Sequence, residues 1–344
     1  MDFDRYVAEI ERGRSPSALA GRFGPDNLVV LARTVSTNLL ARGVAVDYES
    51  EGLDLTPMLV LALEQTGGRG RQGNTWSSPR GQGVYATLVQ PYEKPDLLPS
   101  LPLLVGVGLC RALGPHLPRG CRLKWPNDLL VPDDPGATHA APAAHATHAA
   151  HGALAAVGAA AAAGADVATA PPAHRGRKIG GILIEALVHP GDGCVALIGF
   201  GVNHGQRREE LPPGATSLLL ESGGHLGGPM GVGLTELTWD LVAGLERELA
   251  HADDLPYAVA AYRDLIIHQP GDRLLCRVGE RRIEGTFAGI DDAGRLRLRP
   301  SPGSPGPQPG APGQEAAAAG AGGEAGDAAA GSEVVLSAGE VIER

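Results

Sequence analysis

A short segment rich in glycine and arginine is the part of this sequence best suited to chemistry. Residues 67–76 read GGRGRQGNTW and follow an apolar run at 58–63. Glycine lets backbone N–H groups approach a ligand closely, and each arginine offers a planar fork of donors that fits a carboxylate or a phosphate. The spacing matches neither G-x-G-x-x-G before a helix nor a P-loop, because a strand-like run follows and no lysine does. The segment predicts an anion-binding loop, with a solvated turn or an RGG-like nucleic-acid segment as the alternatives.

Three further motifs carry charged and amide groups at the ends of predicted strands. Residues 124–128 read KWPND and combine a cation, an aromatic face, an amide and a carboxylate, with Pro126 interrupting the strand. Lys178 begins a strand in which two positions, Gly180 and Gly181, have no side chain. Asn203 ends another strand. Each motif is weak alone, and their joint occurrence in this order indicates one composite site.

The apolar patterns predict the elements that must position these motifs. We expect helices at 2–12, 15–22, 98–113, 234–251 and 255–265, and a further one beginning near Asn38 with a Ser/Thr cap. We expect strands at 26–32, 58–63, 83–90, 121–124, 179–187 and 194–202. Because neighbouring strands adjoin in sequence, an α+β domain with a mixed or antiparallel sheet and packed helices is predicted. Short alternating strands at 272–278, 281–290, 295–299 and 333–336 predict a small C-terminal β barrel.

Composition narrows the class of protein. The net charge of −10 argues against general affinity for nucleic acids or membranes, and no signal peptide or apolar membrane span is present, so a soluble cytoplasmic protein is expected. The Ala/His-rich segment 133–175 and the Pro/Gly/Ala-rich segment 300–331 are predicted to be disordered inserts. The four cysteines form no C-x-x-C pair, so reduced buried thiols are expected. The histidines at 139, 145, 148 and 151 are flanked by alanines that supply no second shell, and no metal site is predicted there.

Taken together, the motifs resemble the biotin–protein ligases (biotin–[acetyl-CoA-carboxylase] ligases). The resemblance rests on STN at 36–38, QTxGRGRxGxxW at 65–76, KWPND at 124–128, KxGGILIE at 178–185 and GxGxN at 199–203. It spans residues 30–344 apart from the two inserts. The family implies a class II synthetase-like catalytic domain at 1–267 and an SH3-like barrel at 268–344. It also implies a reaction of biotin with MgATP to biotinyl-5′-AMP, followed by transfer to a lysine of a biotin carboxyl carrier domain.

The resemblance assigns roles residue by residue. Biotin is expected to contact Ser36, Thr37, Asn38, Gln65, Gly68, Arg69, Gly70, Arg71, Lys178, Gly180 and Gly181. ATP is expected to contact Arg69, Arg71, Trp76, Lys124, Asn127, Lys178 and Asn203. The implied catalytic groups are Lys178, which bridges the biotin carboxylate and the α-phosphate, together with Arg69, Lys124 and Asp128. For Asp128 three roles stay open: a ligand of Mg²⁺, a base for the acceptor lysine, or a carboxylate that holds Lys124.

The sequence departs from the pattern of the biotin–protein ligases in two features, and two rival functions are considered. Only about thirty-five residues precede Ser36, so we expect the monofunctional type without an N-terminal DNA-binding domain, and no operator binding. The insert at 133–175 leads directly to Lys178 and is expected to be a passive tether, with contact to the acceptor protein as the alternative. The rivals are a lipoate–protein ligase and a biotin-binding sensor without turnover. The sequence is compatible with a homodimer but does not define the oligomeric state.

Overall fold

The protein is described by a computed structural model that covers residues 2–13, 27–133, 176–188, 193–226, 231–302, 314–316, 333–336 and 340–342. The helix predicted at 15–22 lies outside the described residues. So do nearly all of the two predicted inserts at 133–175 and 300–331 and the four histidines considered as metal ligands.

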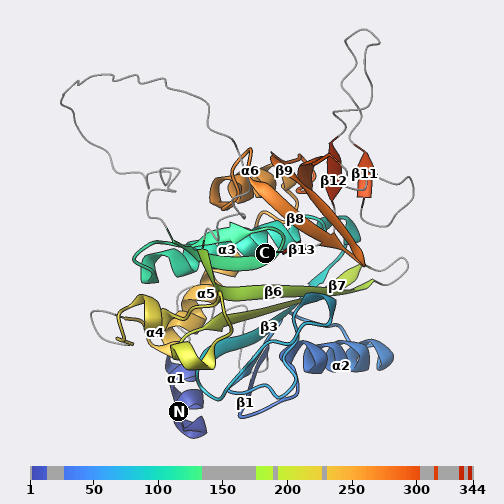
Figure 1. Cartoon of the computed structure of the whole chain (residues 1–344). Helices are drawn as coiled ribbons and strands as arrows, with labels where there is room; N and C mark the ends of the chain where they lie inside the picture. Colours follow the sequence, from blue (N-terminus) through green and yellow to red (C-terminus); the bar gives the residue numbers. More distant parts are fainter. Residues whose placement is uncertain are drawn as a thin grey trace, which may run out of the picture.

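A seven-stranded mixed sheet forms the centre of the molecule (Figure 1). Its strand order is β1-β2-β3-β7-β6-β5-β4, in which β1 pairs with β2 in parallel and all other neighbours are antiparallel. The strands are β1 (Leu28–Leu31), β2 (Met58–Ala62), β3 (Gly83–Tyr92), β4 (Arg122–Lys124), β5 (Asp128–Pro132), β6 (Gly176–Val188) and β7 (Cys194–Asn203). The predicted mixed α+β fold is confirmed. The sequence analysis missed β5, which pairs with β4 across the turn that contains Pro126.

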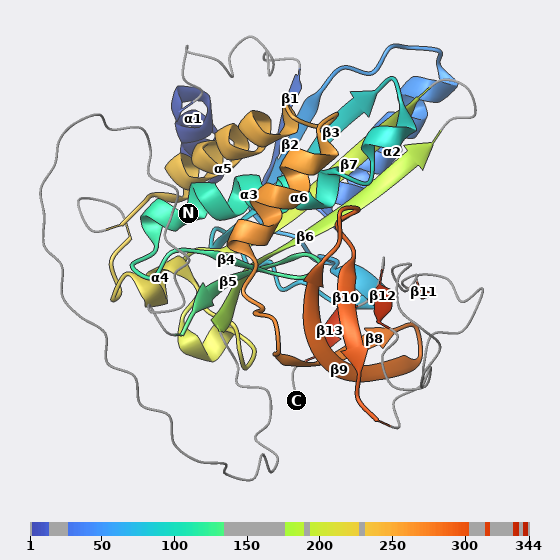
Figure 2. The same ribbon diagram turned by 90° about the horizontal axis from the view of Figure 1, so that it is seen from above.

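Helices cover both faces of this sheet because its strands alternate between two apolar cores. Leu59 and Leu61 of β2 belong to the larger core, which α3 (Leu101–Leu113) and α5 (Leu234–Leu249) complete. Val60 and Met58 point to the other face and pack with Ala41 and Ala45 of α2 (Thr37–Ser50). Figure 2 shows α3, α5 and α6 (Leu255–Leu265) lying together, with α1 (Phe3–Gly13) next to α5. A short helix, α4 (Leu218–Glu221), follows β7.

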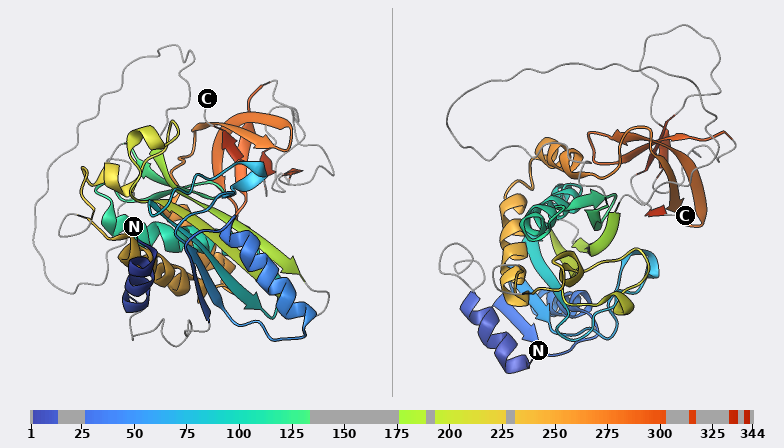
Figure 3. Two further views of the ribbon diagram at one scale, coloured as in Figure 1. Left: turned by 90° about the horizontal axis from the view of Figure 1, so that it is seen from below. Right: turned by 60° about the vertical axis from the view of Figure 1, so that its left-hand side comes forward.

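The C-terminal strands form a separate antiparallel sheet with the order β11-β12-β10-β9-β8-β13. They are β8 (Arg273–Val278), β9 (Arg281–Ile290), β10 (Leu296–Pro300), β11 (Gln314–Ala316), β12 (Val334–Leu336) and β13 (Glu340–Ile342). Among the described strands, no pairing closes this sheet into the predicted SH3-like barrel. Figure 3 shows α1 and this sheet at opposite ends of the molecule.

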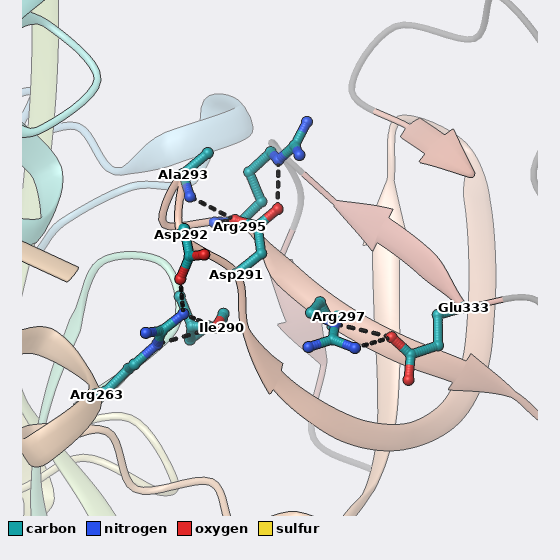
Figure 4. Close-up of polar contacts among 8 residues, drawn as sticks. All are labelled: Arg263, Ile290, Asp291, Asp292, Ala293, Arg295, Arg297 and Glu333. Atoms are coloured by element: carbon teal, nitrogen blue, oxygen red, sulfur yellow. Dashed lines mark hydrogen bonds and ion pairs between the residues drawn. The ribbon is translucent and has the colours of Figure 1, made fainter. Parts of the chain in front are cut away.

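The turn between β9 and β10 joins the C-terminal sheet to the helices (Figure 4). The guanidinium of Arg263 in α6 donates to the carbonyl oxygen of Ile290 at 2.7 Å and to a carboxylate oxygen of Asp292 at 2.8 Å. In the same turn a Cβ at Gly294 would lie 2.6 Å from Leu103 of α3, so this glycine permits close packing. Within the sheet, Arg297 donates to Glu333 at 2.8 Å.

All four cysteines are free and buried. Burial raises the pKa of the Cys110 and Cys194 thiols, and it raises that of Cys276 to about 12. High thiol pKa values leave little reactive thiolate at neutral pH, which agrees with the expected reduced, structural cysteines. No described helix is both long and apolar enough to cross a membrane.

Candidate active site

A cluster of polar side chains forms one end of a pocket on the α2 side of the sheet. Ser36 caps α2 by accepting the N–H of Leu39 at 3.5 Å, which confirms the expected Ser/Thr cap. The next two residues, Thr37 and Asn38, are buried and line the pocket. Gln65, which follows β2, reaches them: its Oε1 accepts the backbone N–H of Thr37 at 2.8 Å. The structure therefore brings together four of the residues that the resemblance assigns to biotin, Ser36, Thr37, Asn38 and Gln65.

Strand positions without side chains make the floor of this pocket. Gly181 of β6 and Gly199 and Gly201 of β7 line it. The carboxamide of Asn38 lies directly over Gly199, and the indole of Trp76 lies over Gly201, where a Cβ would come within 2.5 Å of Nε1. Any side chain at these two positions would displace a pocket residue, so the glycines here are required by close packing.

The loop rich in glycine and arginine folds back on itself beside this floor. Gly70 donates its N–H to the carbonyl of Asn74 at 2.8 Å, and Trp76 donates to that of Gly68 at 2.9 Å. Gly73 has a φ of +77°, and Gln72, with a φ of +53°, is the one described non-glycine residue at positive φ. The turn presents its basic and aromatic residues to the pocket, and those that line it are Arg69, Gly70, Arg71, Gln72, Asn74, Thr75 and Trp76.

A lysine–aspartate pair stands at the centre of the pocket. Nζ of Lys178 lies 2.6 Å from Oδ1 of Asp128 and 5.6 Å from the centroid of the Trp76 ring. Buried Lys124 also lines the pocket, and Asn127 donates to the carbonyl of Ile182 at 2.7 Å, which fixes the KWPND turn against β6. Asp128 therefore forms an ion pair with Lys178, and its role toward Lys124 stays a prediction.

An irregularity in β6 aims Lys178 into the pocket. Leu129 of β5 pairs with Gly180, but Leu130 pairs with Lys178, so one extra residue, Ile179, is inserted on β6. In a regular strand Lys178 and Gly180 would face the same side, whereas the insertion places Lys178 on the side of Gly181. The backbone of Lys178 is also held by its N–H donating to Gly214 at 2.8 Å and by its carbonyl accepting the N–H of Thr216 at 2.8 Å.

Three residues assigned to ligands do not line this pocket. Gly180 faces Leu129 and Gly201, to which a Cβ would come within 2.9 Å, and Gly68 packs against the loop itself. Asn203 is buried; it donates to the carbonyl of Thr216 at 3.0 Å and accepts from Gln206 at 3.2 Å. These contacts make Asn203 a support for the segment that holds Lys178. The assigned contact of Asn203 with ATP stays a prediction.

The structure adds residues that the sequence analysis missed. Thr87 of β3 bonds both Thr37 and Asn38, Ser78 accepts from Gln65, and Glu185 of β6 accepts from Asn38. Val341 of β13 lines the pocket, so the C-terminal sheet contributes to its wall. Only Glu185 lay within a quoted motif. The others follow from strand register, for which the sequence carries no local signal.

Among the described residues, no group of three histidine, cysteine, aspartate or glutamate side chains is arranged to hold a metal ion. Asp128 is the single carboxylate that lines the pocket, and it is paired with Lys178. This donor set suits at most an ion such as Mg²⁺, which keeps waters and substrate phosphates as most of its ligands.

His204, which directly follows β7, gives the protein a predicted pH dependence. Its Nε2 lies 2.8 Å from the carbonyl of Val232, and burial lowers its pKa although this hydrogen bond opposes the shift. The unfolded chain therefore binds the proton more readily, and the free energy of unfolding is expected to fall as the pH drops below about 6.5. Urea unfolding between pH 5 and 7.5 measures this, and His204→Gln should flatten the slope. Equal slopes in both proteins would contradict the assignment.

Comparison with known proteins identifies the class. Residues 47–203 match the model of the Biotin/lipoate A/B protein ligase family. The chain is 29% identical over 286 residues to a biotin–[acetyl-CoA-carboxylase] ligase from Paracoccus denitrificans, covering 78% of this chain and 93% of that protein. It is 28% identical over 302 residues to the ligase of that name from Mycobacterium tuberculosis, covering 84% and 89%. The fold is similar to that of a biotin protein ligase from Aquifex aeolicus in complex with biotin and ATP, with a TM-score of 0.52, 20% identity and coverage of 81% and 93%.

The match over residues 47–203 thus identifies a domain of the Biotin/lipoate A/B protein ligase family. Within that group, the chain is similar to biotin–[acetyl-CoA-carboxylase] ligases, two curated members of which it matches over most of their length.

Proposed function

We propose that this protein activates biotin with ATP, forming biotinyl-5′-AMP and pyrophosphate, and then transfers biotin to a lysine of a carrier domain. One observation carries the proposal. A single pocket joins an uncharged polar cluster at Thr37 and Asn38 to a cationic centre at Lys178 and Arg69. A ligand with a polar ring at one end and a carboxylate at the other fits such a pocket, and the cations suit phosphates next to that carboxylate.

In the first step the biotin carboxylate attacks the α-phosphorus of ATP, an O–P bond forms, and pyrophosphate leaves. Both reactants are anions, so the barrier falls when fixed cations neutralise the charge that gathers between them. Lys178 is the group we assign to this bridging position. Arg69, Arg71 and Lys124 extend the positive charge toward the phosphates. Trp76 Nε1 is buried and has no partner among the described residues, which supports a contact from this N–H to the nucleotide.

In the second step the amine of the acceptor lysine attacks the acyl carbon and AMP leaves as the acyl–oxygen bond breaks. The turn at 67–76 must admit the ligands and then cover a mixed anhydride that water would hydrolyse. Asp128 keeps Lys178 oriented. Mg²⁺, entering with ATP, would supply further neutralisation of the phosphates, with Asp128 as its one protein ligand.

The finer structural and partner assignments are part of the same proposal. A class II synthetase-like domain at 1–267 and an SH3-like unit at 268–344 are supported by the central mixed sheet and the separate C-terminal sheet. The partner is the biotin carboxyl carrier domain of a carboxylase, in the cytoplasm and without binding of DNA. The names of the curated relatives, which are biotin–[acetyl-CoA-carboxylase] ligases, support a carboxylase as the source of this carrier domain.

Pyrophosphate release with ATP and either biotin or lipoate, followed by transfer of label to a carrier domain, tests the proposed function. We expect release with biotin and transfer to the carrier. Release with lipoate alone would favour the lipoate–protein ligase. Tight binding of biotin without release would identify a sensor.

Replacing Asp128 with asparagine tests its role. Because the ion pair with Lys178 orients the cation, Asp128→Asn is expected to slow adenylation about 10-fold, with little change in KM for biotin. Single-turnover kinetics of the two half-reactions measure this. If only the transfer step slows, Asp128 acts on the acceptor lysine instead. If neither step changes, it has none of the proposed roles.

A further inference from the structure

The hydroxyl of Thr87 lies at the centre of a buried hydrogen-bond relay behind the polar end of the pocket. Thr87 is completely buried in β3, opposite Gly199 of β7. Its Oγ1 lies 2.6 Å from Oδ1 of Asn38 and 2.9 Å from Oγ1 of Thr37. Thr87 does not line the pocket itself, so any effect on a ligand must pass through these two neighbours.

The direction of each hydrogen bond in the relay can be assigned by counting protons. The carboxamide of Asn38 has one atom near the carbonyl of Leu183, at 3.2 Å, and near the carboxylate of Glu185, at 3.0 Å. Both of these groups only accept, so that atom must be the nitrogen, Nδ2. The oxygen of the carboxamide therefore faces Thr87.

Because the Asn38 oxygen can only accept, the single proton of the Thr87 hydroxyl is donated to it. Oγ1 of Thr87 is then left as an acceptor. The hydroxyl of Thr37 has two neighbours inside the protein, Oγ1 of Thr87 at 2.9 Å and Oε1 of Gln65 at 3.2 Å. Both are acceptors, so the proton of Thr37 is used within the protein. Toward the pocket, Thr37 offers only lone pairs.

Gln65 has the opposite polarity. Its Oε1 accepts the backbone N–H of Thr37, which can only donate, so the other atom of the amide is the nitrogen. Nε2 donates one proton to Ser78 at 2.9 Å. Its second proton has no partner among the described residues and can be donated to a ligand. An acceptor at Thr37 thus stands beside a donor at Gln65.

We propose that Thr87 is a positioning residue that fixes Thr37 as an acceptor, so that this end of the pocket selects a ring bearing an N–H donor next to a carbonyl. The inference rests on the proposed function and deepens it. The ureido ring of biotin has this pair of groups, whereas the dithiolane ring of lipoate has neither. A buried acceptor that a ligand leaves without a donor is strongly unfavourable, so the relay gives a physical reason for discrimination against lipoate.

The test compares Thr87→Val, which removes the hydroxyl at nearly constant shape, with Thr87→Ser, which keeps it. In biotin-dependent exchange between ATP and pyrophosphate, Thr87→Val is expected to raise KM for biotin about 10-fold or more and to leave KM for ATP within about twofold. Thr87→Ser should restore KM for biotin to near the wild-type value. Thr238→Val is the matched control, because Thr238 is a completely buried threonine in α5 that bonds only Leu234.

Wild-type protein provides a second measurement that does not depend on the folding of a variant. In two isosteric cyclic carbamates, one or the other ureido N–H of biotin is replaced by oxygen. At least one of them is expected to bind about 10-fold more weakly than biotin. If both carbamates bound as tightly as biotin, or if Thr87→Val and Thr87→Ser behaved alike, the assignment would be overturned while biotin ligation stayed intact. Absence of any biotin-dependent exchange in the wild type would overturn the proposed function and this inference together.

Discussion

Replacing Lys178 with alanine is expected to lower the rate of biotin adenylation by roughly 10²- to 10³-fold, the effect typical of removing one fixed charge from a preorganised site. Nζ of Lys178 is held by Asp128 at 2.6 Å, and its backbone N–H and carbonyl are both hydrogen bonded to the segment 214–216. The cation therefore does not need to be reoriented as negative charge develops. Single-turnover formation of biotinyl-5′-AMP measures the loss directly, and Lys94→Ala, at an exposed lysine outside this pocket, is the matched control.

A double variant separates the loss of the cation from the exposure of an unpaired carboxylate. If Lys178→Ala were slow only because Asp128 had become an uncompensated anion near the substrate phosphates, adding Asp128→Asn would restore most of the rate. We expect no such recovery, because the bridging charge itself is missing. Restoration to within about 10-fold of the wild type would contradict the catalytic role of Lys178.

The sequence predicted those parts of the fold and the site whose pattern lies within a single helix, strand or motif. Helix α6 begins and ends at the predicted residues 255 and 265, because the apolar repeat lies within the element, and the structure adds Asp254 as its N-cap. The KWPND segment was recognised by its residues, but β5 was missed, since Pro126 suggested that pairing ends there. The structure shows a turn after which Asp128 pairs back with Lys124.

The different positions of Gly180 and Gly181 relative to the pocket have a physical cause. The resemblance assigns Lys178, Gly180 and Gly181 to ligands, and in a regular strand Lys178 would share its face with Gly180. The extra residue Ile179 reverses this relation, so Gly181 shares the pocket with Lys178 and Gly180 does not. Such an insertion is defined by the pairing of β6 with β5, which is distant in sequence, so no local pattern along β6 predicts it. Thr87 was missed for a similar reason, because its importance comes from its register with Gly199.

Replacing Gly199 with alanine is expected to have the second large effect, an increase in KM for biotin of about 10-fold or more with the protein still folded. The new Cβ would collide with the carboxamide of Asn38, and backbone on β7 cannot move away without breaking its pairing with β3 and β6. Asn38 must then lose its hydrogen bonds to Thr87 and Glu185. Thr87 is no longer fixed as a donor to Asn38, so Thr37 is no longer fixed as an acceptor toward the pocket.

Gly205→Ala is the matched control for this substitution. It adds the same methyl group close to the end of β7, where the nearest atom, on Leu226, would be 3.7 Å away. Titration of biotin in the exchange assay, with thermal unfolding measured in parallel, distinguishes the outcomes. If Gly199→Ala raised KM for ATP as much as KM for biotin, the glycine would support the sheet in general and not the orientation of Asn38. A rise in KM for biotin alone would show that the glycine at position 199 of β7 is needed to orient Asn38 of α2 for binding of biotin.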